Sequence, residues 1–148
     1  PEMIRRAQSR QTRVLGSRFR QDSVLENYSP SRILGNRVLN VVFSLATLRP
    51  THDLGSGLNL FYTSDLARIP FSTLSDSFNF NVELLLAFYR EQIGLEFMPI
   101  HWRETDQTSN ARNFSVAFTM LASLRNWLNR SARQQTRFTH YATELLTN

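Results

Sequence analysis

Helix-like and strand-like hydrophobic patterns alternate along this chain, and that alternation limits the folds it can adopt. Apolar residues recur every three or four positions in the longer segments, as in amphipathic helices, and they cluster or alternate in short segments between them, as in strands. This order is typical of an α/β protein. The few strands make a thin sheet for a free-standing α/β domain. The predicted elements are helices over 1–13, 31–48, 79–93 and 112–130, a strand that ends within 14–19, and strands over 58–62 and 95–103.

Local signals refine these expected elements. Gly16 is predicted to turn the first strand, which places Arg18 just beyond its carboxyl end, where open α/β sheets bind ligands. Ser31 is expected to cap the next helix and Gly94 to end the third. The amphipathic pattern of the helix over 31–48 is carried by Ile33, Leu34, Val38, Val41, Val42, Leu45 and Leu48.

Composition excludes several classes of function. The 148 residues suffice for one ordinary domain, and the absence of cysteine excludes a disulfide scaffold, a thiolate nucleophile and cysteine-bound metal sites. All 17 basic residues are arginine, so lysine Schiff-base chemistry and a Walker lysine are excluded as well. With 12 acids the net charge is +5, and arginine suits bidentate recognition of phosphate or carboxylate. No apolar run in the sequence approaches the length that spans a bilayer.

Five short blocks, in a fixed order, give the sequence a recognisable likeness. Together they resemble family 2 glycosyltransferases, most closely the dolichol- and polyprenyl-phosphate glycosyltransferases, over about residues 1–118. The blocks are Leu15-Gly16-Ser17-Arg18-Phe19, Ser31-Arg32 with Asn36-Arg37, Asp53 with Ser56-Gly57, Phe80 with Glu83-Leu84-Leu85, and Glu96 with Pro99-Ile100 and Trp102-Arg103.

The resemblance implies an α/β fold, the C-terminal half of a GT-A-like mixed sheet with flanking helices. Residues 1–111 correspond to the acceptor-side half of such a domain, and 112–148 to a C-terminal amphipathic helix and basic tail. The family's nucleotide pocket and acidic metal motif belong to the other half, so Mg²⁺ or Mn²⁺ is expected for the complete enzyme with its ligands mostly outside this chain. This piece is not expected to catalyse transfer unaided.

The resemblance also assigns roles to single residues. Arg18 and Arg32 match arginines that bind the acceptor phosphate, and a guanidinium pair offsets the charge of approaching phosphates. Asp53 matches a loop aspartate proposed as base or as orienting group; orientation is favoured, because a phosphate acceptor is already ionised. The supporting residues of the acceptor loop and its surroundings are Ser56, Gly57, Glu83, Arg103 and Arg112, the last standing in for a lysine of the family.

The implied function is transfer of a sugar from a nucleotide-sugar, of the GDP-mannose or UDP-glucose type, to a polyprenyl phosphate. The phenylalanine-bearing helix over 112–130 fits an interfacial helix resting on the bilayer, so a cytoplasmic protein peripheral at the membrane face is expected. Nucleic acid is not expected as a partner, because the arginines are dispersed. A homo-oligomer is left open.

Other interpretations stay beside this one. The chain can instead be a basic binding module for nucleic acid or anionic membrane, or an inactive fragment that keeps the fold. Arg18 and Arg32 can be ordinary surface arginines, Asp53 a turn former, and Glu83 a salt-bridged helix residue. His52, His101 and His140 lack a metal-ligand spacing, which argues against a zinc site.

Overall fold

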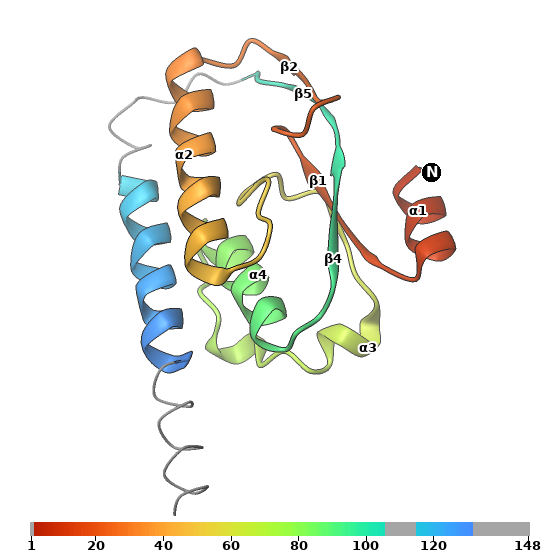
Figure 1. The fold of residues 1–148 in the computed structure, drawn as a ribbon, viewed down its shortest axis with the longest axis vertical. Coiled ribbons are helices and arrows are strands. Elements are labelled where there is room, and N and C mark those ends of the chain that lie inside the picture. Colours follow the sequence, from red (N-terminus) through yellow and green to blue (C-terminus); the bar gives the residue numbers. More distant parts are fainter. Residues whose placement is uncertain (1, 106–114, 132–148) are drawn as a thin grey trace, which may run out of the picture.

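The protein is a mixed α/β molecule with a small mixed sheet and flanking helices, seen in a computed structural model that describes residues 2–105 and 115–131 (Figure 1). Its elements are α1 (Glu2–Arg10), β1 (Arg13–Ser17), β2 (Val24–Glu26), α2 (Pro30–Thr47), β3 (Asn59–Leu60), α3 (Thr63–Leu66), the 3₁₀ turn η1 (Phe71–Thr73), α4 (Phe80–Arg90), β4 (Leu95–Pro99), β5 (His101–Arg103) and a last helix over 115–131. The predicted helices and strands exist; β2, α3 and η1 were not predicted.

Two small sheets replace the single sheet that the sequence suggests. In the first, β1 lies between β3 and β4, parallel to β4 and antiparallel to β3. In the second, β2 and β5 pair in parallel. The predicted strand over 95–103 is therefore divided at Ile100. Its N–H still donates to the carbonyl of Ser17 in β1 at 3.0 Å, whereas its carbonyl accepts from the backbone N–H of Val24 at 3.2 Å. Pro99 ends β4, as expected of a residue that cannot donate to a ladder.

Gly16 lies inside β1, so the turn predicted there is wrong. Its N–H donates to the carbonyl of Leu58 at 2.7 Å. A Cβ at this position would stand 3.1 Å from that carbonyl oxygen and 3.0 Å from Cγ2 of Ile100. Glycine is needed here because the neighbouring backbone comes too close for a side chain.

The three-stranded sheet separates two hydrophobic clusters. Val14 packs with Ala7, Met98 and Ile100 on the α1 side, whereas the next residue, Leu15, joins the larger cluster on the other side. That larger cluster draws Phe43 from α2, Leu85 from α4 and Met120 and Leu124 from the helix over 115–131. Figure 1 shows α1 on the opposite side of the sheet from these three helices. The helix over 115–131 thus shares a core with elements of residues 2–105.

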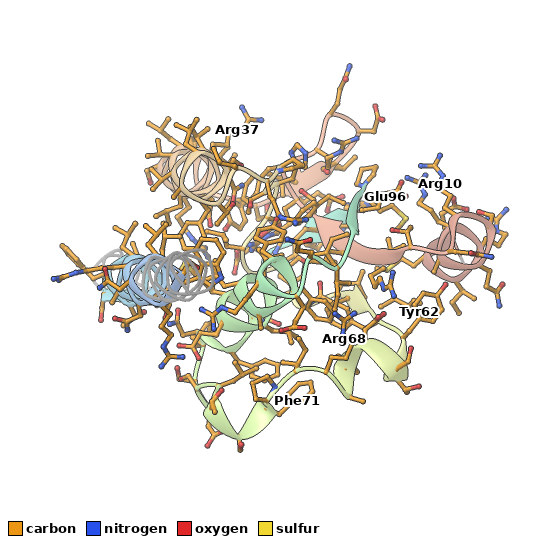
Figure 2. The ribbon with its side chains drawn as sticks, turned by 60° about the horizontal axis from the view of Figure 1, so that its bottom comes forward. Arg10, Arg37, Tyr62, Arg68, Phe71 and Glu96 are labelled. Atoms are coloured by element: carbon orange, nitrogen blue, oxygen red, sulfur yellow. The ribbon has the colours of Figure 1, made fainter. Side chains whose placement is uncertain are left out.

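Ion pairs hold α1 against the sheet. Glu96 of β4 accepts hydrogen bonds from Arg10 at 2.8 Å and Arg6 at 3.1 Å, and Figure 2 shows Arg10 and Glu96 together at this edge. Tyr62 adds a hydrogen bond to the carbonyl of Ala7 at 2.9 Å.

The helix α2 places its apolar stripe outward. Surface helices normally turn such a stripe to the core. Here the buried positions are Asn40, Phe43 and Thr47. The exposed side chains are Leu34 at 66%, Val38 at 53%, Val41 at 57%, Val42 at 37%, Leu45 at 71% and Leu48 at 90%.

The helices differ from prediction in three places. Ser29, not Ser31, is the N-cap of α2, with Pro30 in the first turn. The helix α4 ends at Arg90, and Gln92 rather than Gly94 adopts the left-handed conformation, with φ of 55°. In the helix over 115–131 the predicted stripe is divided: Leu124 is buried, but Phe118 is 72% exposed.

Candidate functional site

The residue after β1, Arg18, makes a buried bidentate ion pair with Asp53. Nε of Arg18 donates to Oδ2 of Asp53 and Nη2 donates to Oδ1, both at 2.8 Å. The two side chains are only 9% and 0% exposed. The prediction that Arg18 lies just beyond the carboxyl end of the first strand is confirmed.

The Asp53 carboxylate is fully occupied by this arrangement. Besides the guanidinium it accepts from the backbone N–H of Arg18 and from that of Gly55, each at 2.9 Å. Burial by itself lowers the pKa of Arg18, but the hydrogen bond and charge of Asp53 outweigh it, so this pKa is raised. The geometry makes Asp53 the group that fixes Arg18 in place, because three of the four hydrogen bonds that its carboxylate accepts come from Arg18 and the fourth comes from the Gly55 backbone.

The polar face of α2 holds the loop that carries Asp53. Asn40 donates to the carbonyl of His52 at 2.8 Å, and Ser44 exchanges hydrogen bonds with the backbone of Thr51 at 2.9 and 3.2 Å. Ser17 of β1 also donates to the His52 carbonyl, at 3.1 Å. The loop is thus fixed between α2 and β1, which explains why a helix face with asparagine and serine is turned inward.

Ser56 and Gly57 complete this loop. Ser56 donates to the carbonyl of Gly16 at 2.6 Å, which ties the loop to β1. Gly57 has φ of 71°, in the left-handed region that favours glycine. Ser56 therefore anchors the loop to β1, and Gly57 allows the backbone to turn after it.

Tyr28 brings Arg18 and Arg32 together. The guanidinium carbons of Arg32 and Arg18 lie 4.6 and 5.7 Å from the centroid of the Tyr28 ring. The Tyr28 hydroxyl accepts from Asn36 at 3.3 Å. The rings of Phe19 and Trp102 lie 5.3 and 5.5 Å from the Arg18 guanidinium. Two arginines fourteen positions apart in the sequence therefore meet around one aromatic ring.

Each of these arginines already faces a carboxylate. Nη1 of Arg32 donates to Oε2 of Glu104 at 3.0 Å, and the two side chains are 19% and 16% exposed. The formal charges of Arg18, Arg32, Asp53 and Glu104 sum to zero. An anion that binds Arg32 bidentately has to compete with Glu104, which is the more accessible of the two acids.

Two predicted supporting residues, Glu83 and Arg103, lie away from the Arg18–Asp53 pair. Glu83 accepts from the backbone of Ser75 at 2.7 Å, from Asn79 at 3.3 Å and from Ser123 at 2.9 Å, and so joins α4 to the helix over 115–131. Arg103 pairs with Glu26 at the second sheet. This contact and that of His101 lower the pKa of Glu26. Arg112 lies outside the described residues.

Tyr28, Asn40 and Glu104 belong to the site but were not predicted from the sequence. Tyr28 lies in a segment with no recognised motif, and no sequence signal distinguishes it from other aromatic residues. Glu104 follows Trp102-Arg103 directly, so an acid next to Arg103, a predicted supporting residue of the acceptor loop, was the one signal that could have found it. Trp102 belongs to one of the five blocks, and its indole Nε1 is buried with no hydrogen-bond partner among the described residues.

A cavity of about 260 Å³ lies elsewhere, between α4, η1 and the helix over 115–131. Glu83, Arg90, Trp127 and Arg130 are among its lining residues. Burial and the neighbouring Arg130 lower the pKa of Arg90. None of the residues around Arg18 lines this cavity.

Neither a metal cluster nor a membrane span occurs in the part of the chain that the structure describes. Over residues 2–105 and 115–131 no three histidine or acidic side chains gather closely enough to hold an ion. No helix among the same residues is long and apolar enough to cross a bilayer.

The resemblance to family 2 glycosyltransferases rests on the five sequence blocks alone. No protein-family model matches the chain, and comparisons with curated proteins and with solved structures give no match either.

Proposed function

We propose that this chain forms the acceptor side of a glycosyltransferase that moves a sugar from a nucleotide-sugar to a polyprenyl phosphate. The observation that carries the proposal is the meeting of Arg18 and Arg32 on Tyr28. These are the two arginines that the family resemblance assigns to the acceptor phosphate. The mixed order of the β3-β1-β4 sheet is consistent with the implied architecture.

In this proposal Arg32 is the arginine that receives the phosphate. Its partner Glu104 is half-buried and is bound through a single nitrogen, at 3.0 Å. A phosphate displaces that carboxylate and gains bidentate contacts. The buried indole N–H of Trp102 has no acceptor among the described residues, and a phosphate oxygen would be a suitable acceptor for it.

Arg18 and Asp53 have positioning roles in the same proposal. The four hydrogen bonds to Asp53 fix the Arg18 guanidinium against Tyr28, so its charge faces the phosphate without reorganisation. The acceptor oxygen is ionised near neutral pH and needs no base. It forms the bond to the anomeric carbon as the bond to the nucleoside diphosphate breaks, with inversion.

The divalent ion of the complete enzyme has no built site among residues 2–105 and 115–131. In the proposal, the residues of this chain bind and orient the acceptor phosphate. When bound, Mg²⁺ or Mn²⁺ would neutralise the departing diphosphate.

The test is transfer of radiolabelled sugar to undecaprenyl phosphate in detergent, with GDP-mannose or UDP-glucose and Mg²⁺ or Mn²⁺, by the full-length gene product. Arg32→Gln is the diagnostic variant. Arg68→Gln is the matched control, because Arg68 is also paired with an acid, Glu91 at 3.2 Å, but contacts none of the site residues. We expect lipid-linked product to fall at least about tenfold in Arg32→Gln and to be unchanged in Arg68→Gln. Transfer to undecaprenyl phosphate that is equal in both variants contradicts the proposal.

A further inference from the structure

The outward stripe of α2 is a continuous apolar line. Leu34, Val38, Val41, Leu45 and Leu48 follow one another at intervals of three and four, and each is at least half exposed. Over its 18 residues α2 is about 27 Å long, so this line runs along most of one side of the molecule. An exposed patch of this kind marks a surface that binds something.

The helix next to α2 also exposes apolar side chains. The helix over 115–131 shares a core cluster with α2, and Figure 1 shows the two side by side. It exposes Phe118 at 72%, Leu121 at 37% and Leu128 at 39%.

Charge on these two helices has one sign only. The sequence of α2 contains no Asp or Glu, and neither does the segment 115–131. The basic residues of the two helices are Arg32, Arg37, Arg125 and Arg130. Figure 2 shows Arg37 projecting outward from α2. Arg32 is already paired with Glu104. A second copy of the same face offers Arg37 no counter-charge, whereas an anionic surface does.

We propose that α2 lies flat on an anionic lipid bilayer, with its apolar stripe in the acyl boundary and Arg37 among the headgroups. An amphipathic helix with arginine on its flank and no acid is suited to this position. The sequence predicts this role for the helix over 112–130; the exposed fractions assign the main contact to α2. The inference extends the proposed function, because the opposite face of α2 holds the Asp53 loop and so brings the arginine site close to lipid phosphates.

The experiment uses the absence of cysteine in the chain. A single Leu45→Cys variant of the full chain is labelled with an environment-sensitive fluorophore, and Ile4→Cys on α1, also exposed at 51%, is the matched control. The probes are vesicles of phosphatidylcholine alone and of phosphatidylcholine with phosphatidylglycerol, without polyprenyl phosphate or sugar nucleotide. The Leu45→Cys label should shift to the blue and become accessible to lipid-borne quenchers on the anionic vesicles, while the Ile4→Cys label should not respond.

Variants on the apolar stripe test whether the stripe itself contacts the lipid. Val41→Glu with Leu45→Glu should weaken vesicle binding more than about tenfold without changing the circular dichroism, since both side chains are exposed. Arg37→Gln should weaken it about fivefold, and Ile4→Glu should not change it.

Three outcomes overturn the inference: a blue shift that depends on protein concentration without vesicles, which indicates a second copy; equal responses of the two labels; and vesicle binding that survives both glutamates. Since no polyprenyl phosphate is present, vesicle binding through α2 can succeed while phosphate recognition fails, and the reverse, so the two proposals are tested separately.

Discussion

At the scale of residues, the site is organised by two arginines in different electrostatic situations. Arg18 is buried with Asp53 and is satisfied within the protein, whereas Arg32 is half-buried and holds Glu104 through one nitrogen. The first arrangement is rigid, because any change leaves a buried charge without a partner. In the second arrangement, an external anion can replace the Glu104 carboxylate on Arg32 at a low cost in free energy.

Removing Asp53 should destabilise the fold strongly. Asp53→Ala leaves the Arg18 guanidinium buried without a counter-charge, which costs about 3–5 kcal/mol. The exposed pair Glu2–Arg5 supplies the control, and Glu2→Ala should cost less than about 1 kcal/mol. Urea unfolding measures both. The double variant Arg18→Met with Asp53→Leu should cost less than Asp53→Ala alone; a larger cost would show that the ion pair itself is required for stability.

Removing the charge of Glu104 should strengthen phosphate binding. Glu104→Gln frees Arg32 from its competing carboxylate. A short, soluble isoprenyl phosphate should then bind several-fold more tightly, which corresponds roughly to the stabilisation that a half-buried ion pair contributes. Titration followed by ³¹P resonance shifts gives the affinity. Weaker binding in Glu104→Gln would mean that Glu104 orients Arg32 for the phosphate instead of competing with it.

His52 should make stability depend on pH. Burial, and then the charge of Arg20, lower its pKa from the ordinary value of 6.5. The neutral ring is thus favoured in the folded state, and its contribution is complete above pH 6.5 and lost as the pH falls toward the lowered pKa. Unfolding free energies between pH 7.5 and pH 5, roughly spanning that window, should fall less steeply in His52→Gln than in the natural chain. Parallel curves would contradict this prediction.

At the scale of elements, the reversed orientation of α2 has the largest consequences. Asn40 and Ser44 face inward because they bind the backbone of Thr51 and His52, and the apolar stripe of Leu34, Val38, Val41 and Leu45 then lies at the surface while Phe43 stays in the core. The polar face of α2 therefore positions the Asp53 loop, and the apolar face of the same helix stays exposed.

Hydrophobic periodicity predicted where the long helices lie but not how they face. The pattern of α2 indicates an amphipathic helix equally well in either orientation, and only the contacts of Asn40 and Ser44 decide between them. Strand β3 pairs over just two residues, and β2 over three, too short for alternation to be recognised. Arg18, Arg32 and Asp53 were grouped through family resemblance, whereas Tyr28 and Glu104 join them through tertiary contacts.

Two glycines should respond oppositely to alanine. Gly16→Ala places a methyl group 3.1 Å from the Leu58 carbonyl oxygen and 3.0 Å from Cγ2 of Ile100, and should cost about 1–3 kcal/mol by forcing β1 and its neighbours apart. Gly35→Ala, in the middle of α2 with no atom within 4 Å, should stabilise the fold by about 0.5–1 kcal/mol. Thermal unfolding of the two variants distinguishes them. A stabilising Gly16→Ala would contradict the close approach described for β1.

At the scale of the whole molecule, the arginine site and the exposed apolar face of α2 lie on the same side of the sheet. The α1 side is closed by the Glu96 ion pairs, whereas the other side carries α2, the Asp53 loop and the helix over 115–131. The arginine site, the Asp53 loop and the outward apolar stripe of α2 therefore belong to the same half of the protein. Such an arrangement suits a reaction whose acceptor is anchored in a lipid layer.

The measurement that tests phosphate recognition by Arg32 most directly compares undecaprenyl phosphate with undecaprenol, which differ only in the phosphate. Both are placed in vesicles of phosphatidylcholine, and binding of the full chain is measured for the natural sequence, Arg32→Gln and Arg68→Gln. We expect tighter binding to the phosphate form, about tenfold or more, lost in Arg32→Gln and kept in Arg68→Gln. Equal binding to the phosphate and the alcohol by the natural chain would contradict the proposed function.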